Sequence, residues 1–416
     1  MPGSPRRPLV IALSLIAVAG IAAAVVSSWR PPPVVPIPVT PLQVRETWRT
    51  TASHGETDSL AVYRGDANDP AWLFATDKHG NRIQVFDAST GKYLRDVGTS
   101  GGGRGEFLRP NGICVARPAE DLALLLVVER DNHRLTAWRL PELNPAEAWP
   151  LEAESLSKPY GIVVAGNGDA YVTDNSRDAG ARVRRIPLGQ ADKRSKSGAF
   201  VERGFGERSG PGLLRFVESI AADPIYRRLY ICDESPWSRN VKVYSDEGKF
   251  LGQTFGEGYI LDEPEGIALW PEGEGGWIIL TNQAKELSTF HFFDRRTLRH
   301  VGCFVGNPRI ANTDGIAVTQ GTLGELAGGA IYAVDNDGPV AAYAWRDVAA
   351  ALQLDSQFPR DESAAPASSR EADRDPSSPR RDPLRDVLPA RGDPEDLLMK
   401  KGQDHPPDLI DRPIGR

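Results

Sequence analysis

Apolar runs of strand length alternate with short polar stretches along most of the chain, from about residue 43 to residue 354. Six units share one order, which is an apolar run, acidic or amide residues, a polar turn and a second alternating run. The copies are WLFATDKHGNRIQVFD, LLLVVERDNHRLTAW, DAYVTDNSRDAGARVRRI, RLYICDESPWSRNVKVYS, GWIILTNQAKELSTFHFFD and GAIYAVDNDGPVAAYAW. Their spacing of roughly 45–60 residues is typical of propeller blades.

A further apolar strand precedes five of the copies, in RPNGICVA, KPYGIVVA, FVESIAAD, EPEGIALW and NTDGIAVT. For the first copy, the matching segment is DSLAVYRG or DANDPAW. Outer strands such as KYLRDVG complete units of about four strands each. The pattern predicts an all-β, six-bladed β-propeller over residues 43–354, with residues 44–51 supplying a strand that closes the ring. Helical periodicity is confined to residues 346–354, which disfavours a barrel of alternating strands and helices.

The two ends of the chain differ from this repeating region. Arg6 and Arg7 precede an apolar run from Leu9 to Val26, and a proline-rich stretch follows. Residues 1–30 are therefore expected to be a signal peptide or a membrane anchor, with cleavage left open. The protein would then be exported, as a periplasmic, extracellular or singly anchored protein. Residues 31–42 are expected to form a stiff linker, and the polar residues 355–416 a disordered tail.

Charge and cysteine content exclude several classes of protein. The net charge of -7 gives no support for nucleic-acid binding. The three cysteines, Cys114, Cys232 and Cys303, are too few for a disulfide framework, and each lies in an apolar run. We expect them to be buried small hydrophobic residues, since no zinc spacing is present and the six histidines show no close pairing. The segment TSGGGRGEF lacks the end of a nucleotide-binding loop and predicts a connection between blades. We expect a monomer.

Polar residues stand where the first strand of each hairpin begins and where the second ends. In an antiparallel hairpin these ends lie side by side, which pairs Glu218 with Asp233, Tyr160 with Asp174 and Glu265 with Asn282. Because the hairpins are radial, the polar ends should converge on the mouth of a central channel. The oxygen-bearing residues are Glu218, Asp233, Glu234, Glu263, Glu265, Asp314, Asp335 and Asp337.

Carboxylates this close repel one another unless a cation lies between them, and calcium accepts six to eight oxygen ligands. The basic residues Lys78, Arg82, Arg130 and Arg134 follow the second strands of the first two blades. The mouth is thus expected to have a basic and an acidic side, suited to a phosphate-rich ligand bound partly through calcium. The alternative is that any single acidic residue at a strand end serves its turn.

Several segments resemble the β-propeller phytases, which are six-bladed, calcium-dependent hydrolases of phytate. These are DPAW…ATDKHGNRIQVFD, KPYGIVV, VESIAAD…LYICDE, EPEGIALW…ILTNQ and NTDGIAV…IYAVDNDG, followed by YAWRDVAAAL. The resemblance implies that Lys78, Arg130 and Tyr160 contact phosphate and act in catalysis. The calcium ligands that it implies are Asp69, Glu218, Asp233, Glu234, Glu265, Asp314 and Asp337. In such enzymes, water activated by calcium attacks phosphorus.

The chain departs from this family at several positions. The acidic pair before the first Pro-Ala is Asn68-Asp69, and Asn111-Gly112-Ile113-Cys114 lacks a carboxylate. Asp174-Asn175 lacks a lysine, and Gly315-Ile316-Ala317 lacks an aspartate. These changes weaken both the phosphate side and some calcium positions.

A second resemblance concerns the blade connections. GGGRGEFLRPNGICV, FGERSGPGLLRFVESIAAD and FGEGYILDEPEGIAL are similar to the blade-joining signature of NHL-type propellers, which are often binding modules. Three functions therefore stay open. The leading one is a calcium-dependent phosphomonoesterase that releases phosphate from inositol phosphates. The others are a noncatalytic propeller that binds a protein or glycan in the cell envelope, and a metal-dependent lactonase or esterase.

Overall fold

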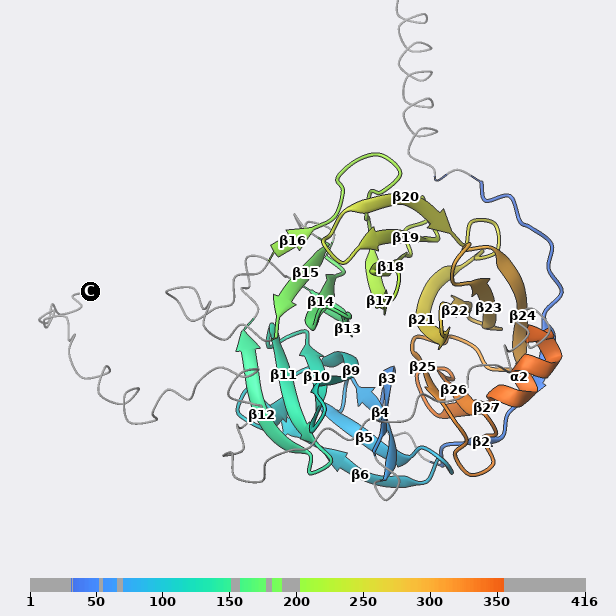
Figure 1. The fold of residues 1–416 in the computed structure, drawn as a ribbon. Helices are drawn as coiled ribbons and strands as arrows, with labels where there is room; N and C mark the ends of the chain where they lie inside the picture. The colour runs from blue at the N-terminus through green and yellow to red at the C-terminus, as the bar shows by residue number, and fades with distance from the viewer. Residues whose placement is uncertain are drawn as a thin grey trace, which may run out of the picture.

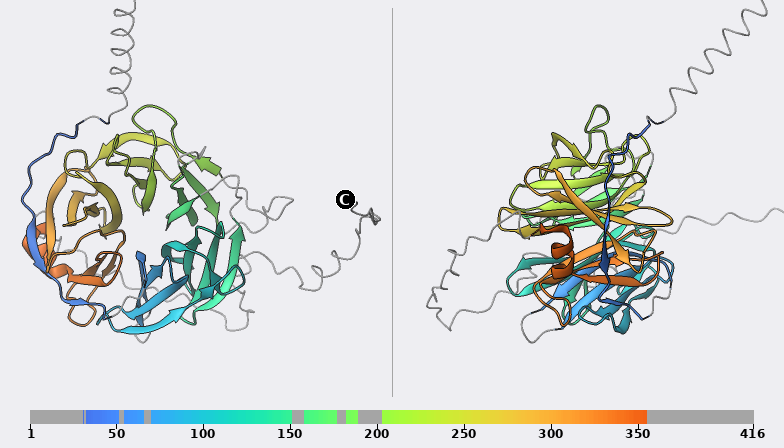
Figure 2. Two further views of the ribbon diagram at one scale, coloured as in Figure 1. Left: turned by 180° about the vertical axis from the view of Figure 1, so that it is seen from behind. Right: turned by 90° about the vertical axis from the view of Figure 1, so that its right-hand side faces the viewer.

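The computed structural model arranges the strands radially around one axis (Figure 1), and Figure 2 shows the same ring from behind and edge-on. It describes residues 31, 33–51, 55–65, 70–150, 158–176, 182–188 and 203–354. The expected leader over residues 1–30, the tail over residues 355–416 and the candidate ligand Asp69 lie outside this part of the chain. Within it, six sheets of four or five strands and one short two-stranded ladder are formed. The predicted six-bladed β-propeller is confirmed.

Each blade runs from an innermost strand outward, in chain order. Blade 1 consists of β3 (Thr57–Arg64), β4 (Ala71–Asp77), β5 (Arg82–Asp87) and β6 (Tyr93–Val97). Blade 2 consists of β9 (Pro110–Ala119), β10 (Leu122–Glu129), β11 (Arg134–Leu140) and β12 (Asn144–Pro150). Blade 3 consists of β13 (Pro159–Val164), β14 (Asp169–Asp174), β15 (Val183–Pro187) and β16 (Arg203–Phe205). Blade 4 consists of β17 (Val217–Asp223), β18 (Arg228–Asp233), β19 (Asn240–Ser245) and β20 (Phe250–Phe255). Blade 5 contains β21 (Glu263–Glu272), β22 (Gly275–Gln283), β23 (Thr289–Asp294) and β24 (His300–Asn307). Blade 6 contains β25 (Ile316–Gln320), β26 (Gly329–Val334) and β27 (Val340–Ala344).

The N-terminal strands close the ring. Strand β2 (Trp48–Arg49) pairs antiparallel with β27 as the outermost strand of blade 6, which confirms the predicted closing strand. Strand β1 (Leu42–Arg45) pairs parallel with β24 and adds a fifth strand to blade 5. The predicted helix is α2 (Trp345–Leu352), and the ring of Trp345 stacks on that of Trp270 at 3.7 Å between centroids. The segment TSGGGRGEF connects blades 1 and 2 through the parallel ladder of β7 (Thr99–Ser100) and β8 (Glu106–Phe107).

The hydrophobic core is divided among the boundaries between neighbouring blades. Phe74 and Leu125 pack together between blades 1 and 2, whereas Trp277 and Tyr343 pack between blades 5 and 6. Burial of each such side chain contributes about 1.5–3 kcal/mol. The innermost strands contact one another in the order β3, β9, β13, β17, β21, β25 and again β3. The blades are therefore held at fixed positions around the axis.

The innermost strands of blades 1 to 5 carry a β-bulge near the end where they begin. Val217 pairs with Asp233 and Ile220 with Ile231, so that two residues, Glu218 and Ser219, lie opposite one residue of β18. Register shifts at the same place occur in blades 1, 2, 3 and 5. The predicted pairing of Glu218 with Asp233 is therefore wrong by one residue, as are the pairings predicted for Tyr160 and Glu265. A bulge of this kind redirects a side chain from the sheet face.

Glycine follows the redirected residue in four of the six blades. A Cβ atom on Gly161 would lie 2.2 Å from the carbonyl oxygen of Glu218 in the next blade. A Cβ atom on Gly315 would lie 2.2 Å from the carbonyl oxygen of Asp58. At Gly161 and Gly315, the innermost strands thus approach too closely for a side chain. The redirected residues just before these glycines are consequently brought together at the axis.

Candidate metal centre

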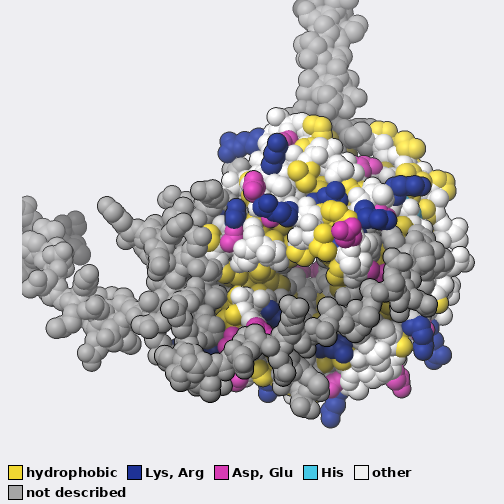
Figure 3. Space-filling view, in the orientation of Figure 1, with side chains coloured by type: hydrophobic (Ala, Val, Ile, Leu, Met, Phe, Trp, Pro, Cys, Tyr) yellow, Lys and Arg dark blue, Asp and Glu magenta, His cyan; other side chains and the backbone are white. Residues whose placement is uncertain are grey.

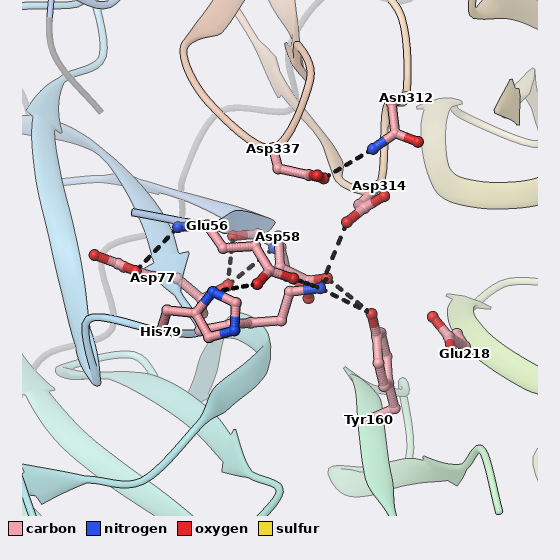
Figure 4. Close-up of polar contacts among 12 residues, drawn as sticks. Glu56, Asp58, Asp77, His79, Tyr160, Glu218, Asn312, Asp314 and Asp337 are labelled. Carbon is pink, nitrogen blue, oxygen red and sulfur yellow. Dashed lines mark hydrogen bonds and ion pairs between the residues drawn. The ribbon is translucent and has the colours of Figure 1, made fainter. Parts of the chain in front are cut away.

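Each blade places one polar side chain at the axis; in blades 1 to 5 it lies at the bulge of the innermost strand, and in blade 6 it lies two residues before β25. We call this set the inner ring, and it consists of Asp58, Asn111, Tyr160, Glu218, Glu265 and Asp314. Asp314 is half-buried and the other members are buried. Figure 4 shows Asp58, Tyr160, Glu218 and Asp314 directed toward a shared space.

Asp58 is a functional candidate that the sequence prediction missed. It occupies the same place in Asp58-Ser59-Leu60-Ala61 as Glu218 does in Glu218-Ser219-Ile220-Ala221. The signal is therefore present in the repeat, but the apolar pattern allows two possible segments for the innermost strand of the first blade. The structure assigns DSLAVYRG to the innermost strand of blade 1.

Three glutamates from blades 4 and 5 form the most compact acidic group at the axis. Glu218 and Glu265 belong to the inner ring, and Glu234 directly follows β18. One carboxylate oxygen from each of the three lies within 4.8 Å of the other two, and all three side chains are buried. The Oε1 atom of Glu234 is buried without a hydrogen-bond partner. The structure thus brings together three of the predicted calcium ligands.

Lys78 lies beside this group as the centre of a second polar cluster. Its Nζ atom is 2.8 Å from Asp58 Oδ1, 3.0 Å from Glu56 Oε1 and 3.6 Å from Asp314 Oδ2. The Tyr160 hydroxyl donates a hydrogen bond to Asp58 Oδ1 at 2.8 Å and lies 3.5 Å from Lys78 Nζ. Figure 4 shows Asp58 of blade 1, Tyr160 of blade 3 and Asp314 of blade 6 around this cluster. Lys78 and Tyr160, both predicted to contact phosphate, therefore lie in one cluster.

Amide side chains fix the orientation of the inner-ring carboxylates. Asn175 Nδ2 donates to Glu218 Oε1, and Gln283 Nε2 donates to Asp314 Oδ1. Asn312 Nδ2 donates to Asp337 Oδ1 at 3.0 Å, and this contact holds the predicted ligand Asp337 near Asp314. In the first two contacts, an amide from one blade holds a carboxylate of the next. At the departure Asp174-Asn175, the amide of Asn175 is therefore a hydrogen-bond donor to Glu218.

Asp233 does not join the glutamate group. Its carboxylate accepts hydrogen bonds from the backbone N–H groups of Arg215, Phe216 and Ser235 at 3.2–3.3 Å. The residues at the same place in the other blades, which are Asp77, Glu129, Asp174, Asn282 and Asp335, also accept backbone N–H groups. This repeated use identifies Asp233 as a residue that fixes a loop. It agrees with the alternative that a single acidic residue at a strand end stabilises its turn.

Arg130 also lies apart from the Lys78 cluster. Its ion pair over the described residues is with the adjacent Asp131, at 3.9 Å. Lys78 is the only lysine or arginine that the structure, within those residues, pairs with an inner-ring carboxylate. The expected basic side of the mouth is therefore reduced to one lysine that three carboxylates already neutralise.

The acidic group retains protons strongly when no cation is present. Burial, followed by the charge of Asp58, raises the pKa of Glu218 to about 7. Burial also raises the pKa of Glu234 and of Glu265 well above the usual range, followed by the effect of neighbouring glutamates. Burial and the charge of Asp58 raise the pKa of Asp314 to about 9. Several carboxylates at the axis are thus neutral near pH 7 unless a cation replaces their protons.

The glutamate group fits a divalent cation with oxygen ligands. Calcium–oxygen distances are about 2.3–2.6 Å, so that ligands on opposite sides of one calcium ion lie about 4.8 Å apart. The three glutamate oxygens lie within this span. Hard carboxylate oxygens favour calcium, magnesium or manganese over softer metal ions. The partnerless Oε1 atom of Glu234 and the raised carboxyl pKa values both agree with a site for a cation.

The stability of the cation-free protein should fall as the pH rises from about 5 to about 9. The pKa values of Glu218 and Asp314 are higher in the folded chain, at about 7 and about 9, than the ordinary values of 4.5 and 3.8. Their protonation thus stabilises the fold at low pH, and this contribution, on the order of a few kcal/mol, is lost as the pH passes the folded pKa values. Thermal unfolding with a chelator should show the decline, and excess calcium should flatten it. Equal slopes in both solutions would contradict this expectation.

Charged side chains are mixed on the face that Figure 3 presents. Lysine and arginine side chains lie among aspartate and glutamate side chains, and they do not form one continuous basic patch on the described part of this face. Among the described residues, no helix is long and apolar enough to cross a membrane.

Comparisons with known proteins concern the fold. The family DUF5128, described as a 6-bladed beta-propeller, matches residues 68–131. The gluconolactonase XC5397 from Xanthomonas campestris is similar over 76% of this chain and 99% of its own, with 15% identity and a TM-score of 0.49. Hydrazine synthase from Kuenenia stuttgartiensis is similar over 68% of this chain and 75% of its own, with 13% identity and a TM-score of 0.45. A comparison with curated proteins gives no significant match. The chain is a six-bladed β-propeller whose axis is lined by carboxylates.

Proposed function

We propose that this protein is a hydrolase that depends on a divalent cation, most simply calcium, and that opens a carboxylic ester or a lactone. The observation that carries the proposal is the group of three buried glutamates, Glu218, Glu234 and Glu265, with oxygens within 4.8 Å of one another. These residues would hold the cation. When bound, the cation would supply Lewis-acid polarisation of a substrate carbonyl group.

The side chains beside the glutamate group have the properties that ester hydrolysis requires. Asp58 and Asp314 raise the pKa of Lys78 far above its usual value, so that Lys78 remains charged and is a hydrogen-bond donor. Burial raises the pKa of Tyr160, which therefore keeps its proton. Both groups would stabilise negative charge that develops on the substrate oxygen. Once the cation has replaced its proton, Asp314, 3.6 Å from Lys78, would accept the proton of the attacking water.

The charge balance favours an uncharged ester over a phosphate ester. Seven carboxylates gather at this end of the axis in the described chain, namely Glu56, Asp58, Glu218, Glu234, Glu265, Asp314 and Asp337. Lys78 pairs with three of them, whereas Arg130, among the described residues, pairs with Asp131. A phosphate dianion would be repelled unless several cations were bound, whereas a neutral ester needs only one.

The calcium-dependent phosphomonoesterase implied by the phytase resemblance is the second candidate. Asp337 and Asp314 add oxygens beside the glutamate group, and the charge of Asp337 raises the pKa of Asp314. This larger set of oxygens favours more than one bound calcium ion, which is what an inositol phosphate would require. Export of the protein would give either enzyme access to calcium.

A substrate panel with controlled calcium tests the two candidates. The chelator-treated protein would be assayed with a sugar lactone, 4-nitrophenyl acetate, inositol hexakisphosphate and 4-nitrophenyl phosphate, before and after calcium is restored. We expect calcium-dependent opening of the lactone or ester and no release of phosphate. Tyr160→Phe should lower the rate and leave calcium binding intact, whereas the exposed Glu325→Gln should change neither.

Each result of this panel decides between the functions. Release of phosphate would support the phosphomonoesterase. Calcium binding without turnover of either substrate class would indicate a binding module. Failure of calcium to raise the melting temperature would overturn both enzymatic proposals, because a ligand of the folded state must stabilise it by mass action.

A further inference from the structure

A second group of metal-ligating side chains lies in blade 5, away from the axis. His291 belongs to β23, and His300 and Cys303 belong to β24. One ligand atom of each lies within 4.8 Å of the other two, and His291 and Cys303 are each 2% exposed. The expectation that the histidines show no close pairing is therefore wrong, since His291 Nδ1 and His300 Nε2 are 3.1 Å apart.

The local backbone explains why these three residues share one face. His291 and Cys303 are directly opposite in the antiparallel pair of β23 and β24, so that their side chains point the same way. Strict alternation would turn His300, three residues from Cys303, to the other face. A register shift between Phe292 and Phe293 interrupts the alternation and returns His300 to the face of Cys303.

The geometry points to a metal site, and we propose that His291, His300 and Cys303 bind a borderline-soft metal ion such as Zn²⁺. Zinc–nitrogen distances of about 2.0–2.1 Å in a tetrahedron place two nitrogens about 3.3 Å apart, close to the separation of the two histidines. The combination of imidazole nitrogen and thiolate sulfur selects zinc-like ions over calcium. No fourth His, Cys, Asp or Glu among the described residues joins the group, so a tetrahedral ion would keep one position for solvent.

The surroundings orient both imidazoles as ligands. The Thr289 hydroxyl lies 3.0 Å from His291 Nε2, which leaves Nδ1 of the same ring to face His300. A hydrogen bond donated by the second ring N–H is the usual support of a metal-binding histidine. The Tyr259 ring stacks on His300 at 4.0 Å between centroids and fixes its plane.

The chemistry of the two imidazoles is also suitable. Burial lowers the pKa of His291 to about 3 and that of His300 to about 4, so that both rings are in the neutral form that binds metal. Cys303 is a free thiol, and His300 is partly exposed, which gives an ion a route from solvent. A bound ion would join β23 to β24. Because Leu42 of β1 pairs with Phe304, it would also secure the strand to which the N-terminal segment is attached.

Cobalt titration of the full-length, chelator-treated protein tests this site. Co²⁺ bound to a thiolate absorbs in the near ultraviolet, whereas Co²⁺ held only by carboxylates at the axis does not. We expect this band to saturate at one equivalent and to be abolished by Zn²⁺. It should be lost in Cys303→Ser and require at least tenfold more Co²⁺ in His300→Gln.

Matched variants separate this site from other sites in the chain. Cys232→Ser and Cys114→Ser should keep the band, and so should Glu234→Gln, which alters only the axial group. His300→Gln alters a partly exposed side chain. The fold of this variant can be verified by measuring whether calcium raises its melting temperature as it does for the unaltered protein. Absence of the band from the unaltered protein, or its persistence in Cys303→Ser, would overturn the proposal.

Discussion

Replacement of Glu265 by glutamine is expected to change the stability of this protein in opposite directions with and without calcium. In the chelator-treated protein, Glu265→Gln removes one of three adjacent buried carboxyl groups, so the melting temperature should rise. With excess calcium, the variant should melt below the unaltered protein, because it loses a ligand. A ligand at a hundred times its Kd stabilises the folded state by about 2.7 kcal/mol, and most of this should disappear. Differential scanning calorimetry in both solutions measures the two effects.

The matched control is Glu272→Gln. Glu272 is an exposed residue at the other end of the same strand, β21, and its replacement should leave both melting temperatures almost unchanged. If Glu265→Gln lowered the melting temperature equally with chelator and with calcium, Glu265 would be a structural residue and the glutamate group would not be a cation site.

Replacement of Lys78 by methionine is expected to destabilise the protein by about 3–5 kcal/mol, the usual effect of removing one partner from a buried ion pair. The Lys78 and Asp58 side chains are 8% and 1% exposed and lie 2.8 Å apart. Without Lys78, Asp58 would keep a buried charge beside Glu56 and Asp314. Unfolding in guanidinium chloride at pH 7 measures the loss, which should be smaller at pH 5, where more of the surrounding carboxyl groups are protonated.

A second substitution tests the reason for this loss. In the Lys78→Met background, Asp58→Asn removes the unpaired charge and should restore part of the stability, so that the two substitutions are not additive. The exposed Lys92→Met should have an effect within about 0.5 kcal/mol. Additive losses from Lys78→Met and Asp58→Asn would show that the two side chains do not act as a pair.

The architecture could be predicted from the sequence because the apolar pattern repeats six times. The repeat gave the number of blades, the closing strand and the final helix, since each depends on alternation or spacing over many residues. The pairing across the innermost strands was wrong by one residue. A bulge inserts one residue into a strand without changing the composition of that strand. Counting from the turn therefore places Glu218 opposite Asp233, whereas the residue that pairs with Asp233 is Val217.

The candidate site could be predicted only in part, for physical reasons that differ between residues. Glu218, Glu234 and Glu265 were found because acidic residues repeat at the strand ends of successive blades. Asp233 has the same sequence context, and only its three backbone hydrogen bonds distinguish it from a ligand. The pairing of His291 with His300 was missed because it depends on a bulge in β24, which the apolar pattern does not reveal.

The pairing of Arg49 with Ala341 has a consequence for how the protein is made. Strands β1 and β2 leave the ribosome among the first segments of the propeller, yet their partners β24 and β27 are among the last. At about 5–20 residues per second, these early strands wait on the order of tens of seconds with unpaired edges. The nascent chain can pair the strands within a blade during synthesis, but it can close the circle only after the sixth blade has been translated. A chaperone that shields residues 42–49 in this interval would prevent premature pairing with the wrong sheet edge.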